Sequence, residues 1–305
     1  VASLITPILI TDTTYALVSA TLTGTPTCTQ TQMGSAIVTV KTLPTATISG
    51  PTAICSGNTA VITFNGTPNG TVTYTVDGGA NQTITLNGTG SATLTTPTLT
   101  VNSTYALVSI ASSGFPVCSK VLNGSTLITI NAYPTATISG TTTICSGTST
   151  GITFNGTPNA TVTYTINGGT NQTITLSGTG NATLTTPALT SNTTYALVGV
   201  ISSGIATCSQ PQIGTAVITV KALPTATISG TTTICSGTTA VISFNGTANA
   251  TIAYTVDGGT NQTIVLSGTG TATITTPILI ASSTYALVSI ASSAVPICSQ
   301  SQTGT

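Results

Sequence analysis

The chain has 305 residues, of which only 2% are charged, and its three lysines and three acidic residues give a formal net charge of zero. The sequence contains no His, and its acids are three isolated carboxylates, Asp12, Asp77 and Asp257. Because general acid–base catalysis needs a titratable group beside a partner, we expect no catalytic, metal or cofactor site. The three scattered lysines form no basic surface, so we expect no nucleic-acid binding.

The mean hydropathy is +0.47, which raises the question of a membrane. A spanning helix needs a run of about 18 apolar residues. Thr, Ser, Gly and Asn interrupt every apolar run in this chain after a few positions. The sequence therefore predicts no membrane insertion.

A repeat of 90 residues organises the whole chain. The heptapeptide PTATISG begins at Pro44, Pro134 and Pro224. This period is too long for a solenoid coil and is normal for an independently folding domain. The sequence predicts the second half of a repeat at 1–43, complete repeats at 44–133 and 134–223, and a repeat without its last strand at 224–305. We expect the chain to be a window of a longer array.

Hydrophobic residues recur at every second position within a repeat, which is typical of strands with one buried face. Val72, Tyr74 and Val76, for example, alternate with threonines, which suit the exposed face of a sheet. In chain order, the first complete repeat is predicted to form strands at 45–49, 60–65, 71–77, 82–87, 91–95, 104–111 and 126–131. The Asp-Gly and Asn-Gly pairs between these strands favour tight hairpin turns.

Short antiparallel strands in this number and spacing predict an all-β fold of tandem immunoglobulin-like antiparallel β-sandwich repeats. A tyrosine begins the sixth strand of each repeat, where immunoglobulin folds place a tyrosine whose hydroxyl ties back to the preceding corner. The tyrosine-corner candidates are Tyr15, Tyr105, Tyr195 and Tyr285.

Seven cysteines occupy two positions of the repeat, which indicates disulfides and an oxidising compartment. One position holds Cys28, Cys118, Cys208 and Cys298, and the other holds Cys55, Cys145 and Cys235. Without His and without a C-x-x-C pair, a zinc site is not expected. The single Asp of each Asp-Gly turn is interpreted as turn chemistry, since calcium sites need several oxygen ligands.

Two disulfide schemes are open. Pairing within repeats joins Cys55 with Cys118, Cys145 with Cys208, and Cys235 with Cys298. Pairing between repeats joins Cys55 with Cys208 and Cys145 with Cys298, while the other cysteines pair outside this sequence. The second scheme is favoured because the two cysteines of one repeat flank opposite ends of the sandwich. A strand of eight residues spans about 26 Å, whereas a disulfide needs Cα atoms within about 7 Å.

The strings PTATISGTTTICSGTST, YTINGGTNQTITLSGTG, TTYALV and CSQ resemble tandem immunoglobulin-like repeats of giant cell-surface proteins in Bacteroidota. Some proteins of that group are gliding-motility adhesins exported by the type IX secretion system. The resemblance covers the whole chain, and it implies an extracellular, cell-surface location and a role in adhesion or surface movement.

Three functions fit a non-enzymatic array without a unique site. The first is a stalk or adhesive fibre that acts by length, stiffness and many weak contacts. The second is a self-assembling sheath, surface-layer or filament protein, in which neutral threonine-rich faces pack against other copies. The third is a carbohydrate-binding module, although Trp is absent and the tyrosines are predicted to be buried. The expected partners are neighbouring repeats or other copies of the chain, together with surfaces or polysaccharide.

Overall fold

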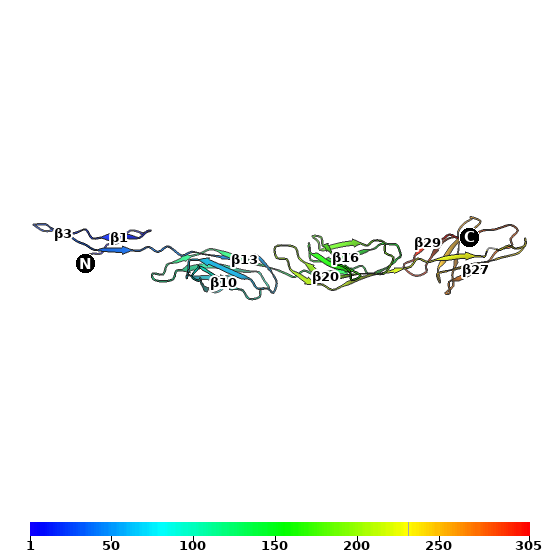
Figure 1. Ribbon diagram of the computed structural model, residues 1–305, viewed down its shortest axis with the longest axis horizontal. Coiled ribbons are helices and arrows are strands. Elements are labelled where there is room, and N and C mark those ends of the chain that lie inside the picture. The colour runs from blue at the N-terminus through cyan, green and yellow to red at the C-terminus, as the bar shows by residue number, and fades with distance from the viewer. Residues whose placement is uncertain (231) are drawn as a thin grey trace. The chain divides into compact units, whose positions relative to one another are not determined.

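The computed structural model describes residues 1–230 and 232–305, and every regular element in that part is a strand (Figure 1). Within these residues no helix is long and apolar enough to cross a membrane. The chain forms two compact units, Val1–Ala132 and Tyr133–Thr305. Each unit contains one complete β-sandwich, so the fold is all-β and immunoglobulin-like, as predicted. The finer division into four segments, 1–43, 44–133, 134–223 and 224–305, stays a prediction.

The sandwich of the first unit consists of two sheets. One sheet has the order β10-β7-β5, formed by Ser91–Thr95, Val61–Gly66 and Ala46–Ser49. The other has the order β6-β13-β11-β8-β9, formed by Ala53–Cys55, Ser125–Asn131, Ser103–Ala111, Thr71–Val76 and Gln82–Thr85. A short β12, Ser119–Val121, pairs with β11.

The alternation of apolar and polar residues in the sequence distinguishes the buried face of these strands from the exposed face. Ile62 and Phe64 of β7 and Val72 of β8 are fully buried, and the Phe64 ring lies 5.1 Å from that of Tyr74. The intervening threonines face outward, where a β-branched side chain suits the pleat without needing a partner. Each sandwich therefore has one apolar core between its sheets.

The second unit repeats this topology in its first half. One sheet contains β14 (Ala136–Ser139), β16 (Gly151–Gly156) and β19 (Asn181–Thr185). The other contains β15 (Thr142–Cys145), β22 (Thr215–Lys221), β20 (Thr193–Ile201), β17 (Thr161–Ile166) and β18 (Gln172–Thr175), with β21 (Ser209–Pro211) beside β20.

The segments at the two ends of the sequence contain the remaining strands. At the start, β1 (Thr13–Ala16) pairs with β4 (Ser35–Val38), and β2 (Ser19–Leu22) pairs with β3 (Cys28–Thr31). The register Tyr15↔Ala36 equals Tyr105↔Thr126 after a shift of 90 residues. The strands of the last repeat are β23 (Ala226–Ser229), β24 (Val241–Gly246), β25 (Thr251–Val256), β26 (Gln262–Val265), β27 (Thr271–Thr275), β28 (Tyr285–Ala291) and β29 (Ser299–Ser301).

Two short strands in each complete repeat were not predicted. β6 has three residues and runs parallel to the end of β13, with Cys55 opposite Asn131. β12 also has three residues, and it is exposed. Three residues are too few to display a period of two, so these strands exist because a neighbouring strand offers them unpaired backbone groups.

The Asp-Gly turn forms as predicted. Asp77 and Gly78 both have positive φ, 52° and 71°, and the N–H of Gly79 donates to the carbonyl of Val76 at 2.9 Å. The Asn-Gly pair at 65–66 behaves differently, because Gly66 is the last residue of β7. A Cβ on Gly66 would collide with the Thr45 carbonyl oxygen, so glycine is needed here for close approach of two strands.

Candidate functional site: the junction between repeats

Most of the few charged side chains form hydrogen bonds with backbone groups. Asp77 Oδ1 accepts the N–H of Thr104 at 2.7 Å, and Oδ2 accepts the hydroxyl of Ser103 at 3.0 Å. Asp257 accepts the equivalent two bonds in the last repeat. In the repeat at 134–223, called the middle repeat below, Asn167 Oδ1 accepts the equivalent N–H at 2.8 Å. The segment 224–305 is called the last repeat. Since a neutral amide accepts the same backbone N–H, this position supplies a hydrogen-bond acceptor that fastens a turn to the next strand.

Asp257 gives the last repeat a pH dependence that the middle repeat lacks. The hydrogen bond from the Thr284 backbone, and then that from Ser283, lower the pKa of Asp257 below its ordinary value of 3.8. A carboxyl whose folded pKa is depressed stabilises the fold above its unfolded pKa, and this contribution is lost as pH falls through the folded value. We expect the urea concentration at the unfolding midpoint of the last repeat to decrease as the pH is lowered from 5 to 2.

Asp257→Asn is the matched variant for this prediction, since Asn already stands at position 167. Its urea midpoint should change less over the same pH interval, because the amide does not titrate. Equal acid sensitivity of the two proteins would show that Asp257 does not carry the effect.

Two of the three lysines lie at the ends of repeats and bond to a loop of the following repeat. Lys221, the last residue of β22, donates from Nζ to the carbonyls of Ala294 at 2.9 Å and Pro296 at 3.4 Å. Lys41 donates in the same way to two carbonyls of residues 115–116, both at 3.4 Å. A lysine has three donors, so one ammonium group can join consecutive repeats without an acidic partner.

Lys221→Met should therefore weaken this junction while keeping the aliphatic part of the side chain. We expect the free energy of unfolding to fall by about 1 kcal/mol, the size of a solvent-accessible hydrogen bond to a charged donor. Lys120→Met is the control, because the Lys120 side chain is exposed and makes no hydrogen bond within the described residues. Chemical denaturation of both variants measures the difference, and equal stabilities would contradict a role for Lys221.

The cysteines form a covalent link at the same junction. Cys145 is bonded to Cys298, with Cα atoms 5.5 Å apart and a sequence separation of 153 residues. Cys145 ends β15 opposite Lys221, so it lies where the chain leaves the middle repeat. Cys298 closes the loop after β28, with its N–H donating to the Ser292 hydroxyl at 2.9 Å. The bond therefore joins two consecutive repeats.

This link is the pair expected from the scheme between repeats, and it excludes the alternative pairings of Cys145 with Cys208 and of Cys235 with Cys298. The pairing of Cys55 with Cys118 is also wrong, because Cys118 is a free, half-buried thiol. Cys28 and Cys235 are free and exposed. The equivalent pairing of Cys55 with Cys208 stays a prediction.

The four tyrosine-corner candidates lie at or near the start of the predicted strand. Tyr105, Tyr195 and Tyr285 are at most 8% exposed, and Tyr15 is half-buried. Burial raises the pKa of the Tyr105, Tyr195 and Tyr285 hydroxyls. The rings therefore belong to the core, while the corner hydrogen bond itself stays a prediction.

Comparison with known proteins identifies no family. No family model matches the sequence, and no curated protein matches it. Among solved structures, a marsupial T cell receptor aligns with 84% of this chain and 99% of its own, at 11% identity and a TM-score of 0.41. The ICAM-5 D1–D4 ectodomain fragment aligns over 96% and 83%, at 12% identity and 0.41. The FN1–FN3 domains of chicken CNTN1 align over 86% and 95%, at 12% identity and 0.25. At these values the similarities carry no functional argument.

Proposed function

We propose that the chain is a non-enzymatic segment of an extracellular fibre or stalk, belonging to a large repetitive surface adhesin of the kind its sequence resembles. The observation that carries the proposal is the Cys145–Cys298 disulfide between consecutive repeats. A bond between neighbouring domains limits their bending and leaves each core unchanged. Its presence also fits an oxidising location outside the cell.

The use of the polar side chains supports a mechanical role. The carboxylates of Asp12, Asp77 and Asp257 accept backbone N–H groups, and Lys41 and Lys221 join repeats. Within the described residues, no group of three or more His, Cys, Asp or Glu side chains comes together. Repetition of one domain with fixed junctions gives reach and many equivalent weak contacts, which add up to avidity.

Electron microscopy of single molecules tests the stalk directly. Under oxidising conditions, the angle at the junction of the middle and last repeats should be narrowly distributed, and reduction should broaden it. A broad distribution in the oxidised protein would contradict a stiffening role for the disulfide. An antibody against the chain should label intact, unpermeabilised source cells, and labelling only after permeabilisation would contradict the extracellular location.

A self-assembling sheath, surface-layer or filament protein is the second candidate function, and one observation favours it: only 2% of the residues are charged, so neutral threonine-rich faces could pack against other copies. Regular polymers of the purified chain would support this candidate over an isolated stalk. The carbohydrate-binding module has less support, because Tyr74 and Tyr105, which would have to supply an exposed aromatic platform, are 3% and 2% exposed.

A further inference from the structure

The disulfide between Cys145 and Cys298 closes a covalent loop around most of two repeats. The bonded residues are 153 positions apart, and the chain between them contains every described strand from β16 to β28. The fully buried rings of Phe154 and Phe244 both lie inside this loop. A covalent path from residue 134 to residue 298 therefore needs only the segment 134–145 and the disulfide, and it passes through neither core.

Residues 134–145 lead from one end of the middle sandwich to the other. The N–H of Ala136 donates to Oε1 of Gln212 at 3.3 Å, just before β22 begins. The strands β14 and β15 follow one another with two residues between them, and β15 ends with Cys145 opposite Lys221, the last residue of β22. The disulfide and the backbone therefore leave the middle repeat at the same end.

The chain that follows Cys145 is fastened to the sandwich by hydrogen bonds of its own. The N–H of Gly147 donates to the carbonyl of Leu189 at 2.8 Å. The N–H of Thr150 donates to the hydroxyl of Thr186 at 3.0 Å. These bonds hold the beginning of the loop, so a pull on the cysteine side chain need not be passed on to β16.

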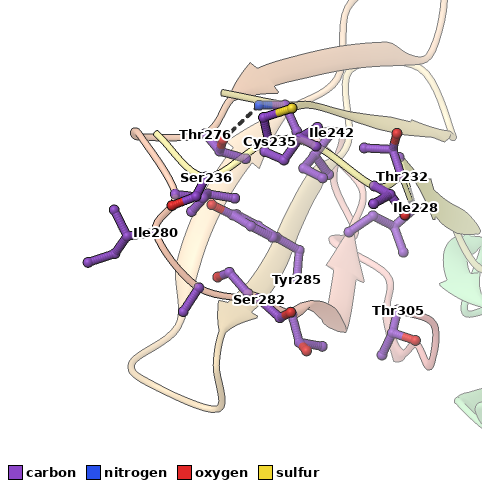
Figure 2. A pocket seen from close by; sticks show the side chains of 18 of the residues that line it. Ile228, Thr232, Cys235, Ser236, Ile242, Thr276, Ile280, Ser282, Tyr285 and Thr305 are labelled. Carbon is purple, nitrogen blue, oxygen red and sulfur yellow. Dashed lines mark hydrogen bonds between the residues drawn. The ribbon is translucent and has the colours of Figure 1, made fainter. Parts of the chain in front are cut away.

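The last repeat contains the same arrangement. Cys235 is the equivalent of Cys145, and the N–H of Gly237 donates to the carbonyl of Leu279 at 2.9 Å. The N–H of Ala240 donates to the hydroxyl of Thr276 at 3.0 Å, and Figure 2 shows this bond together with Cys235. The fastened segment after the cysteine is thus a property of the repeat.

We propose that the disulfide is the load-bearing connection between the middle and last repeats. Tension that enters at residue 134 passes along β14 and β15 to Cys145, crosses to Cys298 and leaves both cores unloaded. The two repeats are then inextensible as a pair, because unfolding of either core adds no length to the covalent path. This inference deepens the proposed function and rests on it, since a stalk or fibre is what bears axial tension.

The length that the disulfide keeps out of reach is large. A fully extended chain spans about 3.3–3.6 Å per residue, so the 153 positions correspond to about 500–550 Å. The disulfide replaces this length by 5.5 Å between Cα atoms. Disulfide exchange requires an attacking thiolate. The connection is therefore durable in the oxidising surroundings expected outside the cell.

Without the disulfide, tension has to cross from β15 to β22. These strands run parallel, and their register extends from Thr142 opposite Ile218 to Cys145 opposite Lys221. A pull on the start of β15 and on the end of β22 acts along both strands, so it strains all the hydrogen bonds between them together. Once these bonds break, the core opens and its chain is drawn out. The parallel pair is thus a noncovalent resistance that bears load only when the disulfide is absent.

Force–extension curves of single molecules test this load path. The full chain is held at a clickable amino acid in place of Tyr133, which is 41% exposed, and at a handle fused after Thr305. In oxidising buffer the wild type should lengthen by no more than about 70 Å, the span of the roughly 20 residues on the covalent path. Cys298→Ser should lengthen by about 500–550 Å more. Wild-type curves that reach the length of Cys298→Ser would overturn the proposal.

Two controls assign the difference to the disulfide. Cys28→Ser removes an exposed thiol that is not on the path, and it should keep the wild-type length. Reduction of the wild type should give the length of Cys298→Ser. A reduced protein that stays as short as the oxidised one would also contradict the assigned path.

Phe154→Ala separates protection from force and ordinary stability. In the Cys298→Ser background it should lower the force at which the middle repeat unfolds, because the core loses a buried ring. In the oxidised protein with both cysteines it should leave the maximum extension unchanged, since residue 154 lies inside the bypassed loop. A longer maximum extension in the oxidised protein would show that tension reaches the core, and the proposal would fall.

These measurements are independent of where the protein is located. A chain with a short oxidised extension that no antibody detects on intact cells would refute the surface stalk and leave the load path intact. A chain that is detected on intact cells and extends fully when oxidised would refute the load path alone.

Discussion

Replacement of Cys298 by Ser is expected to lower the free energy of unfolding of the unit Tyr133–Thr305 by as much as about 5 kcal/mol, because the disulfide closes a long loop in the unfolded chain. The separation of 153 residues makes this a large effect for one bond. The middle and last repeats should also unfold in separate transitions once they are no longer joined. Urea denaturation followed by circular dichroism measures both changes.

Two controls identify the bond as the cause. Cys28→Ser removes an exposed free thiol and should change stability by less than about 0.5 kcal/mol. Cys145→Ser breaks the same bond from the other side and should match Cys298→Ser. Both substitutions remove the same disulfide. Unequal losses of stability would therefore show that the surroundings of one cysteine side chain, and not the bond alone, cause the loss.

Phe154→Ala is expected to destabilise the middle repeat by about 3–5 kcal/mol, since removal of a buried aromatic ring loses its transfer energy and leaves a cavity. Phe154 is fully buried, and its ring lies 5.0 Å from that of Tyr164. This loss is comparable with the whole stability of a small domain. Scanning calorimetry should show one transition moving to lower temperature.

Ile213→Ala is the control for this prediction, because Ile213 is also a large apolar residue of the middle repeat and is 95% exposed. Its removal should shift the transition by no more than about 0.5 kcal/mol. Similar effects of the two substitutions would contradict the core position of Phe154.

The strands could be read from the sequence because alternation assigns each residue to a face. The predicted segment 71–77 corresponds to β8 at Thr71–Val76, and the predicted 126–131 to β13 at Ser125–Asn131. The short β6 and β12 could not be found in this way, since three residues carry no period. Ile54 and Cys55 of the string ICSG belong to the first of them, which lies beside β13, and the sequence predicts no strand there.

The cysteines show where sequence reasoning stops. Their spacing established two positions per repeat, but the 90-residue period is compatible both with bonds within repeats and with bonds between repeats. The choice depends on which ends of two sandwiches adjoin, and the parallel pairing of β15 with β22 sets that by carrying Cys145 to the exit of its repeat. Lys221 was likewise noted only as a scattered charge, and its contacts to a loop 73 and 75 residues away have no local signal.

The sequence by itself determined the repeat, its length, the all-β class, the buried face of each strand and the scarcity of chemically reactive groups. These properties follow from composition and from periods of two and 90 residues. They can be read without knowing which residues are in contact in the folded chain. Only the tertiary structure decided the order of strands in each sheet, the partner of Cys145 and the hydrogen-bond partners of the charged side chains. These depend on contacts between residues far apart in the chain, and in a repetitive sequence many such contacts fit the local pattern equally well.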